Sequence, residues 1–249
     1  MNEKINVRGV AFDNVDLDEA LAIAEGYIER GERCVVFTPN SEIVQMTLED
    51  EGFREIISSA DLILPDGAGV VLASKILKTP LKCKVAGCEF AERLVRESAS
   101  GKYKIFFYGS KPETEEGVSV SELAERKMAE KYEGFKAAGT SHGYVKKENY
   151  PELIEKINSS GAEVLFVCLG VPMQEKFIFE NRDKLSPKVI IGLGGTLDVF
   201  AGTVKRAPEI FVKLSLEWFY RLLKEPKRIG RMMKLPKFIF GTIFSRKEK

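Results

Sequence analysis

The sequence lacks a long apolar run. In its 249 residues, no uninterrupted apolar stretch comes close to the roughly eighteen residues that a membrane-spanning helix needs. The N-terminus, from Met1 to Asn6, also lacks the basic and then apolar regions of a signal peptide. We therefore expect a protein that stays in the cytoplasm. A composition of 44% hydrophobic and 30% charged residues is ordinary for a globular chain, which at this length holds one large domain or two small ones.

Metal-binding patterns are also scarce. The only histidine, His142, lies in a polar loop expected at 139–144 and has no second ligand near it in sequence. An Asp-x-Asp motif at Asp16 and Asp18 coincides with a predicted helix start, where helix capping is the better interpretation. The four cysteines do not have the spacing of a zinc site, so we expect reduced thiols, mostly in the core: Cys34, Cys83, Cys88 and Cys168. The sequence predicts no metal site.

The fingerprint of dinucleotide-binding proteins is incomplete. Gly192, Gly194 and Gly195 supply only half of Gly-x-Gly-x-x-Gly, and no strand-ending acid follows at the right distance. A nicotinamide cofactor is therefore not expected.

Charge is distributed unevenly along the chain. Residues 205–249 carry 13 Lys and Arg against 4 Asp and Glu, whereas residues 1–204 carry 25 against 33, so that +9 and −8 leave a net charge of +1. A basic tail on an acidic body indicates an anionic partner, such as a membrane surface, a nucleic acid or a phosphate-rich substrate.

Short apolar runs alternate with helical patterns along residues 1–204. Such alternation predicts an α/β fold with a doubly wound, mainly parallel sheet. A strand or hairpin is expected at 7–15, and strands are expected at 34–37, 61–65, 82–85, 104–108, 162–169 and 188–192. Helices are expected at 16–30, through the 43–46 stretch, and at 53–60, 69–77, 89–98, 112–131 and 151–160, with a further one opened by the polar pair that follows Met173.

One strand ends abruptly at Pro65-Asp66-Gly67-Ala68-Gly69. Ligands of open α/β sheets bind just beyond the carboxyl ends of the strands, so Asp66 is a candidate catalytic residue. Pro-Asp-Gly is also ordinary turn chemistry, in which the aspartate bonds only its own backbone.

Other predicted strands also end in polar or glycine-rich turns. Thr38 and Asn40 follow one strand at a helix start, where small polar side chains hold a sugar or phosphate or simply cap the helix. Gln174 opens the helix after another strand. Because parallel strands share one carboxyl edge, we expect these residues to line a single crevice with Asp66.

The C-terminal segment interleaves basic residues with large apolar ones. A helix is expected at 207–224 with a charged stripe and an apolar stripe, and a second basic and aromatic segment follows Pro226. This pattern suits an interfacial element on an anionic membrane; the alternative is a solvated helix pair that docks on the body or on another subunit.

Four motifs, taken in order, resemble the WecG/TagA/CpsF glycosyltransferase family, and its TagA branch most closely. They are Thr-Pro-Asn-x-Glu at 38–42, Pro-Asp-Gly-x-Gly at 65–69, Gly-x-Pro-x-Gln-Glu at 170–175, and Leu-Glu-Trp-x-Tyr-Arg-Leu at 216–222. The resemblance covers nearly the whole chain.

The resemblance implies a Rossmann-like fold and an inverting transfer of N-acetylmannosamine from its UDP donor to undecaprenyl-diphosphate-linked N-acetylglucosamine, in wall teichoic acid synthesis. It implies that Asp66 is the base, that Thr38, Asn40 and Gln174 line the pocket, and that Arg221, Arg228 and Arg231 reach the donor diphosphate. Residues 1–204 would form the catalytic body and 205–249 an appendage that docks on the inner membrane face and completes the site. Without a metal site, arginines and helix N-termini would stabilise the leaving diphosphate.

Two alternatives stay open from the sequence. A related transferase for another UDP-sugar, glucose or N-acetylmannosaminuronate, would share these motifs. A non-enzymatic, membrane-peripheral or nucleic-acid-binding module is the other, although no nucleic-acid motif is present, so no nucleic-acid partner is predicted. The oligomeric state is undetermined, and a homo-oligomer is compatible with the sequence.

Overall fold

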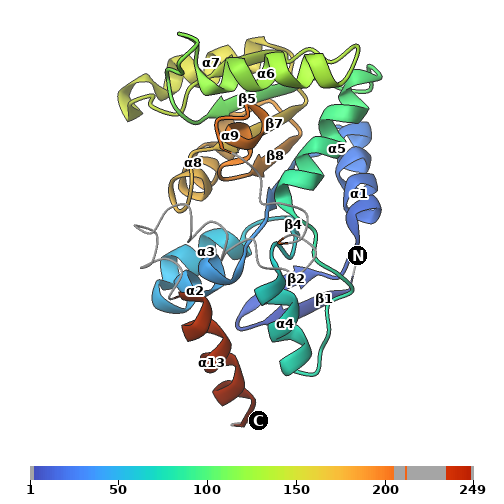
Figure 1. The fold of residues 1–249 in the computed structure, drawn as a ribbon, viewed down its shortest axis with the longest axis vertical. Coiled ribbons are helices and arrows are strands. Elements are labelled where there is room, and N and C mark those ends of the chain that lie inside the picture. Colours follow the sequence, from blue (N-terminus) through green and yellow to red (C-terminus); the bar gives the residue numbers. More distant parts are fainter. Residues whose placement is uncertain (1–2, 205–210, 212–233, 248–249) are drawn as a thin grey trace.

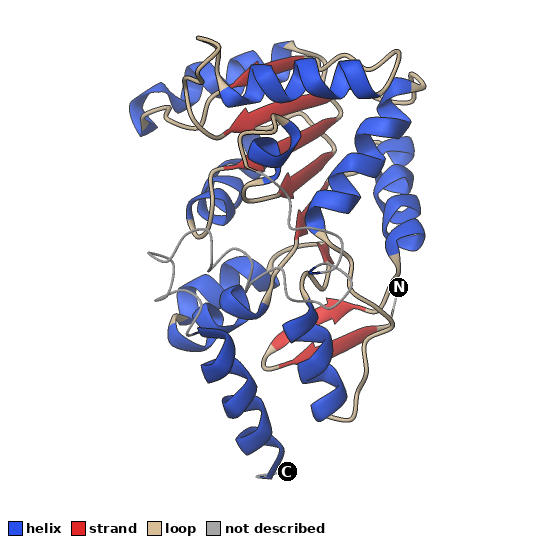
Figure 2. Ribbon diagram, viewed as in Figure 1, coloured by secondary structure: helices blue, strands red, loops and turns tan. Residues whose placement is uncertain are grey.

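A single parallel sheet forms the centre of the protein. The computed structural model describes residues 3–204, 211 and 234–247. Six strands in the order β4-β3-β8-β7-β5-β6 pair in parallel throughout (Figure 2). Their bounds are β3 Cys34–Phe37, β4 Leu62–Ile63, β5 Ile105–Gly109, β6 Gly139–Ser141, β7 Val164–Cys168 and β8 Val189–Gly192. The doubly wound parallel sheet predicted from the sequence is confirmed.

Helices cover both faces of the sheet. On one face, α1, α5, α6 and α9 pack around the side chains of Val36, Phe107 and Phe166; on the other, α2, α3, α4, α7 and α8 pack around Val35 and Phe106. The bounds are α1 Leu17–Arg30, α2 Ser41–Glu49, α3 Glu51–Ser58, α4 Ala68–Ile76, α5 Gly87–Ala99, α6 Val120–Lys131, α7 Tyr150–Ser159, α8 Met173–Asn181 and α9 Thr196–Phe200, with 3-10 turns η1 Lys147–Asn149 and η2 Arg182–Lys184.

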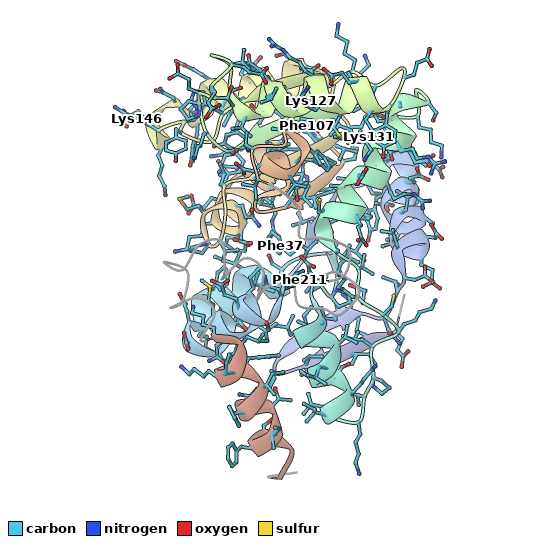
Figure 3. All side chains as sticks on the ribbon, in the orientation of Figure 1. Phe37, Phe107, Lys127, Lys131, Lys146 and Phe211 are labelled. Carbon is cyan, nitrogen blue, oxygen red and sulfur yellow. The ribbon has the colours of Figure 1, made fainter. Side chains whose placement is uncertain are left out.

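The central strands are buried on both sides. Every residue of β3, β5, β7 and β8 is buried, which is why these segments are apolar without polar alternation. In Figure 3, Phe107 lies inside the sheet region whereas Lys127, Lys131 and Lys146 lie at the outside of the molecule. The polar turns at the strand ends are therefore the part of this sheet that is available for chemistry.

The N-terminal segment forms the expected hairpin and then the expected helix. Strands β1 Lys4–Val7 and β2 Val10–Asp13 pair antiparallel. The carboxylate of Asp16 accepts a hydrogen bond from the backbone N–H of Glu19, and the Glu19 side chain accepts one from the N–H of Asp16, so the two form a capping box. Asp16 thus has the helix-capping role that the sequence favoured.

Three local predictions were wrong. Residues 82–85 form no strand, because the N–H of Lys82 bonds the Asn14 side chain and that of Val85 bonds the Pro65 carbonyl, which leaves no ladder to a neighbouring strand. The helix predicted at 112–131 begins only at Val120, where Ser119 and Glu122 form a capping box. Residues 139–141, predicted as a loop, form the short edge strand β6, whose polar sequence carries no strand signal.

The C-terminal helix α13, Lys234–Lys247, packs against α2 and α4. Pro236 is the third residue of this helix in the described range. Phe238 is completely buried in the same core cluster as Ile43 and Val70, and the amines of Lys234 and Lys237 lie 4.0 and 2.6 Å from the Glu49 carboxylate. Figure 1 shows α13 and α4 projecting at the same end of the molecule.

Candidate active site

Four turns meet at the carboxyl edge of four neighbouring strands. The turns after β4, β3 and β8 contain Asp66, Thr38 with Asn40, and the Gly192–Gly195 segment, and Gln174 lies in the first turn of α8, which follows β7. These four strands are adjacent in the sheet. Residues separated by more than a hundred positions in sequence are therefore side by side. The structure places Thr38, Asn40, Asp66 and Gln174 at one edge, where the strand pattern predicted them.

The turn that carries Asp66 is joined to the neighbouring turn by backbone hydrogen bonds. The N–H of Leu64 bonds the Phe37 carbonyl at 2.9 Å, and that of Asp66 bonds the Pro39 carbonyl at 3.3 Å. Gly67 then has a φ of +84°, a conformation that residues with a side chain rarely adopt, and α4 begins at the next residue. Asp66 is half-buried at the N-terminal end of a helix, where a negative charge is stabilised.

The side chains after β3 have both structural contacts and spare hydrogen-bonding groups. Asn40 caps α2, since its Oδ1 accepts from the backbone N–H of Ile43 at 3.1 Å. The Oγ1 of Thr38 donates to the Gly192 carbonyl at 3.3 Å. The cap uses only the oxygen of the Asn40 amide, so its NH₂ group can still donate to a ligand. Capping and ligand binding, the two interpretations of Asn40, are compatible.

Gln174 joins the turns after β7 and β8. Its Oε1 accepts from the backbone N–H of Gly194 at 2.8 Å, and its Nε2 donates to the carboxyl group of Glu175 at 2.9 Å. A Cβ at Gly192 would lie 3.0 Å from this Nε2 and 3.3 Å from the Phe37 ring, so glycine leaves the space that the amide occupies. Phe37, labelled in Figure 3, lies in the middle of the molecule where β3 ends.

Glu175 belongs to the Gly-x-Pro-x-Gln-Glu motif, but its position in the sequence predicts no role for it. It is 1% exposed, and burial raises its pKa from 4.5 to about 7 because the charged form loses hydration that its neighbours do not replace. Its Oε2 is buried and has no hydrogen-bond partner among the residues that the structure describes. Burial of this carboxyl group cannot be seen in the sequence, where Glu175 looks like an ordinary residue of a first helical turn.

A further polar pair at the same edge was missed by the sequence reasoning. Ser110, directly after β5, has a φ of +58°, and its hydroxyl donates to the carboxylate of Asp198 on α9 at 2.9 Å. The backbone carbonyl of Ser110 accepts from the N–H of Gly143 at 2.8 Å. The signal available was the Gly109-Ser110 pair at the end of an apolar strand, which extends the crevice prediction to a fifth strand.

The remaining candidate groups have structural roles or lie outside the described residues. Burial raises the pKa of the Cys34 and Cys168 thiols, and all four cysteines are free, as expected. His142 accepts a hydrogen bond from the Tyr144 backbone N–H at 3.2 Å. Within the described part of the chain, no three His, Cys, Asp or Glu residues cluster as metal ligands would. The predicted diphosphate ligands Arg221, Arg228 and Arg231, and the helix expected at 207–224, fall outside the described residues apart from Phe211.

Comparison with known proteins identifies the family. Residues 5–249, nearly the whole chain, match the glycosyl transferase WecG/TagA/CpsF family. The chain belongs to this family. The resemblance inferred from four short motifs is thereby confirmed, and the group of polar residues at the sheet edge is the candidate active site of a WecG/TagA/CpsF glycosyltransferase.

Proteins with one shared name are similar to this family member over most of its length. Each is an N-acetylglucosaminyldiphosphoundecaprenol N-acetyl-beta-D-mannosaminyltransferase. That of Bacillus subtilis is 38% identical over 98% of this chain and 92% of its own length. That of Bacillus spizizenii is 38% identical over 87% and 81%, and that of Staphylococcus aureus (strain MRSA252) is 33% identical over 95% and 91%.

None of the helices in the described ranges has the length and apolar character required to cross a bilayer.

Proposed function

We propose that this chain transfers N-acetylmannosamine from UDP-N-acetylmannosamine to undecaprenyl-diphosphate-linked N-acetylglucosamine and inverts the anomeric configuration. The observation that carries this proposal is the full-length similarity to relatives whose name states a beta-D-mannosaminyl transfer to N-acetylglucosaminyldiphosphoundecaprenol. The product would be the linkage unit of wall teichoic acid. The site supports the proposal because the Asp66 carboxylate and several neutral hydrogen-bonding groups come from adjacent strand ends at the same sheet edge.

Asp66 is the proposed general base. An inverting transfer needs one displacement, in which the acceptor hydroxyl oxygen bonds to the anomeric carbon while the bond from that carbon to the UDP oxygen breaks. The Asp66 carboxylate takes the hydroxyl proton, and UDP leaves with the bonding electrons on the opposite face of the sugar. The position of Asp66, half-buried after β4 beside the N-terminus of α4, suits a carboxylate that acts in its charged form.

Neutral polar groups bind and orient the donor in this proposal. The Asn40 NH₂ group, the Thr38 hydroxyl and the Gln174 amide come from three neighbouring turns and are partly fixed by their own hydrogen bonds. Groups held in place before the substrate arrives lose little entropy on binding and keep the reacting atoms aligned. These groups would hold the sugar and place its anomeric carbon near Asp66.

Cationic side chains would stabilise the departing diphosphate. We assign this role to Arg221, Arg228 and Arg231, because arginine binds phosphate oxygens in a bidentate manner and keeps its charge at every physiological pH. Catalysis would then proceed without a metal ion. Replacing each arginine singly with alanine should slow transfer more than it weakens binding to anionic vesicles.

The outer surface of α13 suits contact with the membrane that holds the acceptor lipid. Phe240 and Phe244 are each 62% exposed, and Ile243 is 39% exposed on the same face, while Leu72 of the neighbouring α4 is 50% exposed. Lys237 is also largely exposed, and each cation near an anionic leaflet contributes about 1 kcal/mol of attraction. We propose that this end of the molecule, visible at the bottom of Figure 1, docks on the inner face of the membrane.

A donor panel tests the substrate assignment. The full chain is incubated with a water-soluble lipid-diphosphate analogue of N-acetylglucosamine and with the UDP derivatives of N-acetylmannosamine, N-acetylmannosaminuronate and glucose. Transfer only from UDP-N-acetylmannosamine, with a β-1,4 product by NMR, is the expected result. Preference for another donor would mean that the chain uses a different UDP-sugar from the one proposed. Salt-sensitive DNA binding without turnover would contradict the enzymatic function.

Replacing the proposed base tests its role. Asp66→Asn should retain the fold and UDP binding but lower turnover roughly 100-fold or more, the usual scale for loss of a general base. Asp61→Asn is the matched control at the other end of the same strand, where the carboxylate accepts the Val35 N–H at 2.8 Å and has a structural role. Turnover of Asp66→Asn close to that of Asp61→Asn would remove Asp66 from the mechanism.

A further inference from the structure

The Gln174 side chain is held in one orientation from both ends. It is 3% exposed, its Oε1 accepts the Gly194 N–H at 2.8 Å, and its Nε2 donates to Glu175 at 2.9 Å. If the amide turned over, its NH₂ would face the Gly194 N–H and its oxygen would face the Glu175 carboxyl oxygen. The contact with the Gly194 N–H would become repulsive, and so would the contact with the ionised Glu175 carboxylate, so both contacts favour the same orientation.

Glu175 supplies the hydrogen-bond acceptor for the Gln174 amide, which a buried apolar residue could not supply. Its carboxyl group is almost completely buried, and only Oε1 has a hydrogen-bond partner among the described residues, namely the Gln174 amide. A buried carboxyl group with one orphaned oxygen destabilises the folded protein, since an apolar side chain of similar volume would avoid that desolvation. A residue that lowers the stability of the fold and makes no compensating structural contact is a candidate for a functional role.

We propose that Glu175 is a positioning residue that holds the Gln174 amide in the orientation required for the donor substrate. With Oε1 bound to Gly194 and one N–H bound to Glu175, the amide keeps one N–H donor and one acceptor lone pair. These groups would bind the sugar nucleotide through an oxygen acceptor and a hydroxyl donor. The inference rests on the proposed function, because it takes Gln174 to contact the donor.

Glu175→Met is the decisive variant, because methionine is unbranched, has similar volume and cannot accept from the amide. At pH 8 it should unfold at the same or a higher urea concentration than the parent protein, since it removes the buried carboxyl group. Its kcat/KM for the UDP-sugar should nevertheless fall roughly 10-fold or more, the scale expected when a binding group is misplaced. The KM for the acceptor should stay unchanged. A residue with a purely structural role would not combine retained stability with lost donor turnover.

Three further variants complete the test. Glu175→Gln keeps an acceptor oxygen, so it should retain turnover within about threefold of the parent protein. Gln174→Ala should lower kcat/KM as much as Glu175→Met, and the double variant should be no slower than either single one, because both act through the same amide. Asn181→Ala is the control: it removes an equally buried amide on the same helix, which bonds the Phe177 carbonyl, and should leave turnover unchanged.

Normal donor kinetics of Glu175→Met, or additive losses in the double variant, would overturn the proposal. Amide NMR of the parent protein with ¹⁵N-labelled glutamine needs no Glu175 variant and covers the case in which Glu175→Met fails to fold. The Gln174 side-chain signal, identified by its absence in Gln174→Ala, should be protected from hydrogen exchange, and exchange at the rate of an exposed glutamine would equally overturn the inference. A parent protein that transfers no sugar would contradict the proposed function, while the NMR result would still decide whether the Gln174 amide is held in place.

Discussion

The buried carboxyl group of Glu175 predicts an unusual dependence of stability on pH. Burial raises the pKa of Glu175 in the folded protein from 4.5 to about 7. Between these values the folded protein keeps a proton that the unfolded chain has released, so the free energy of unfolding falls as the pH rises. The contribution of the Glu175 proton to the free energy of unfolding is fully present below pH 4.5 and is lost progressively up to about pH 7. Above that pH, Glu175 causes little further change.

The size of the effect follows from the two pKa values. Each unit of difference corresponds to about 1.36 kcal/mol, so a difference of about 2.5 lowers the stability by about 3 kcal/mol between pH 4.5 and pH 8. The variant Glu175→Gln has no titrating group at this position. Its free energy of unfolding relative to the parent protein should therefore rise by about 3 kcal/mol over this range, whatever the absolute cost of burying the new NH₂ group.

Urea unfolding at pH 5, 6, 7 and 8, followed by circular dichroism, measures this difference. Glu180→Gln is the matched control, because Glu180 is half-exposed on the same helix. The control should track the parent protein at every pH, whereas the curve for Glu175→Gln should diverge from both. A constant difference between Glu175→Gln and the parent protein from pH 5 to pH 8 would refute the reasoning from burial.

Three further predictions concern the metal, the C-terminal helix and the crevice. Excess chelator should leave the transfer rate within about twofold, since cationic side chains are assigned to the leaving diphosphate; complete loss that magnesium or manganese restores would contradict this. Phe238→Ala should lower the free energy of unfolding by roughly 3–5 kcal/mol, because Phe238 is fully buried. Phe240→Ala, on the exposed face, should change it by less than about 0.5 kcal/mol and should weaken binding to anionic vesicles. Equal effects of the two variants on unfolding would mean that α13 does not pack as described. Gly192→Ala should slow transfer roughly 10-fold in a folded protein, because its Cβ would lie 3.0 Å from the Gln174 amide nitrogen; an unchanged rate would show that the amide can move without loss.

Most strands of the sheet, and the family, could be predicted from the sequence alone. Segments such as Cys34–Phe37 and Val164–Cys168 are continuously apolar because both of their faces are covered, and that pattern is local and readable. The polar turns after these strands could be assigned to one edge because parallel strands share a carboxyl end. Capping residues such as Asp16 were also readable, since a cap and its helix are only three residues apart.

Tertiary structure alone decided which of these polar groups touch. The hydrogen bond of Gln174 to Gly194 joins two turns separated by a whole strand and helix, and the contact of Ser110 with Asp198 spans 88 positions. The burial that shifts the pKa of Glu175 and the complete burial of Phe238 depend on neighbours brought in by packing, which no local pattern encodes. Sequence periodicity reports only the environment averaged over one element, whereas desolvation and hydrogen-bond partners are set by elements that meet only in the folded chain.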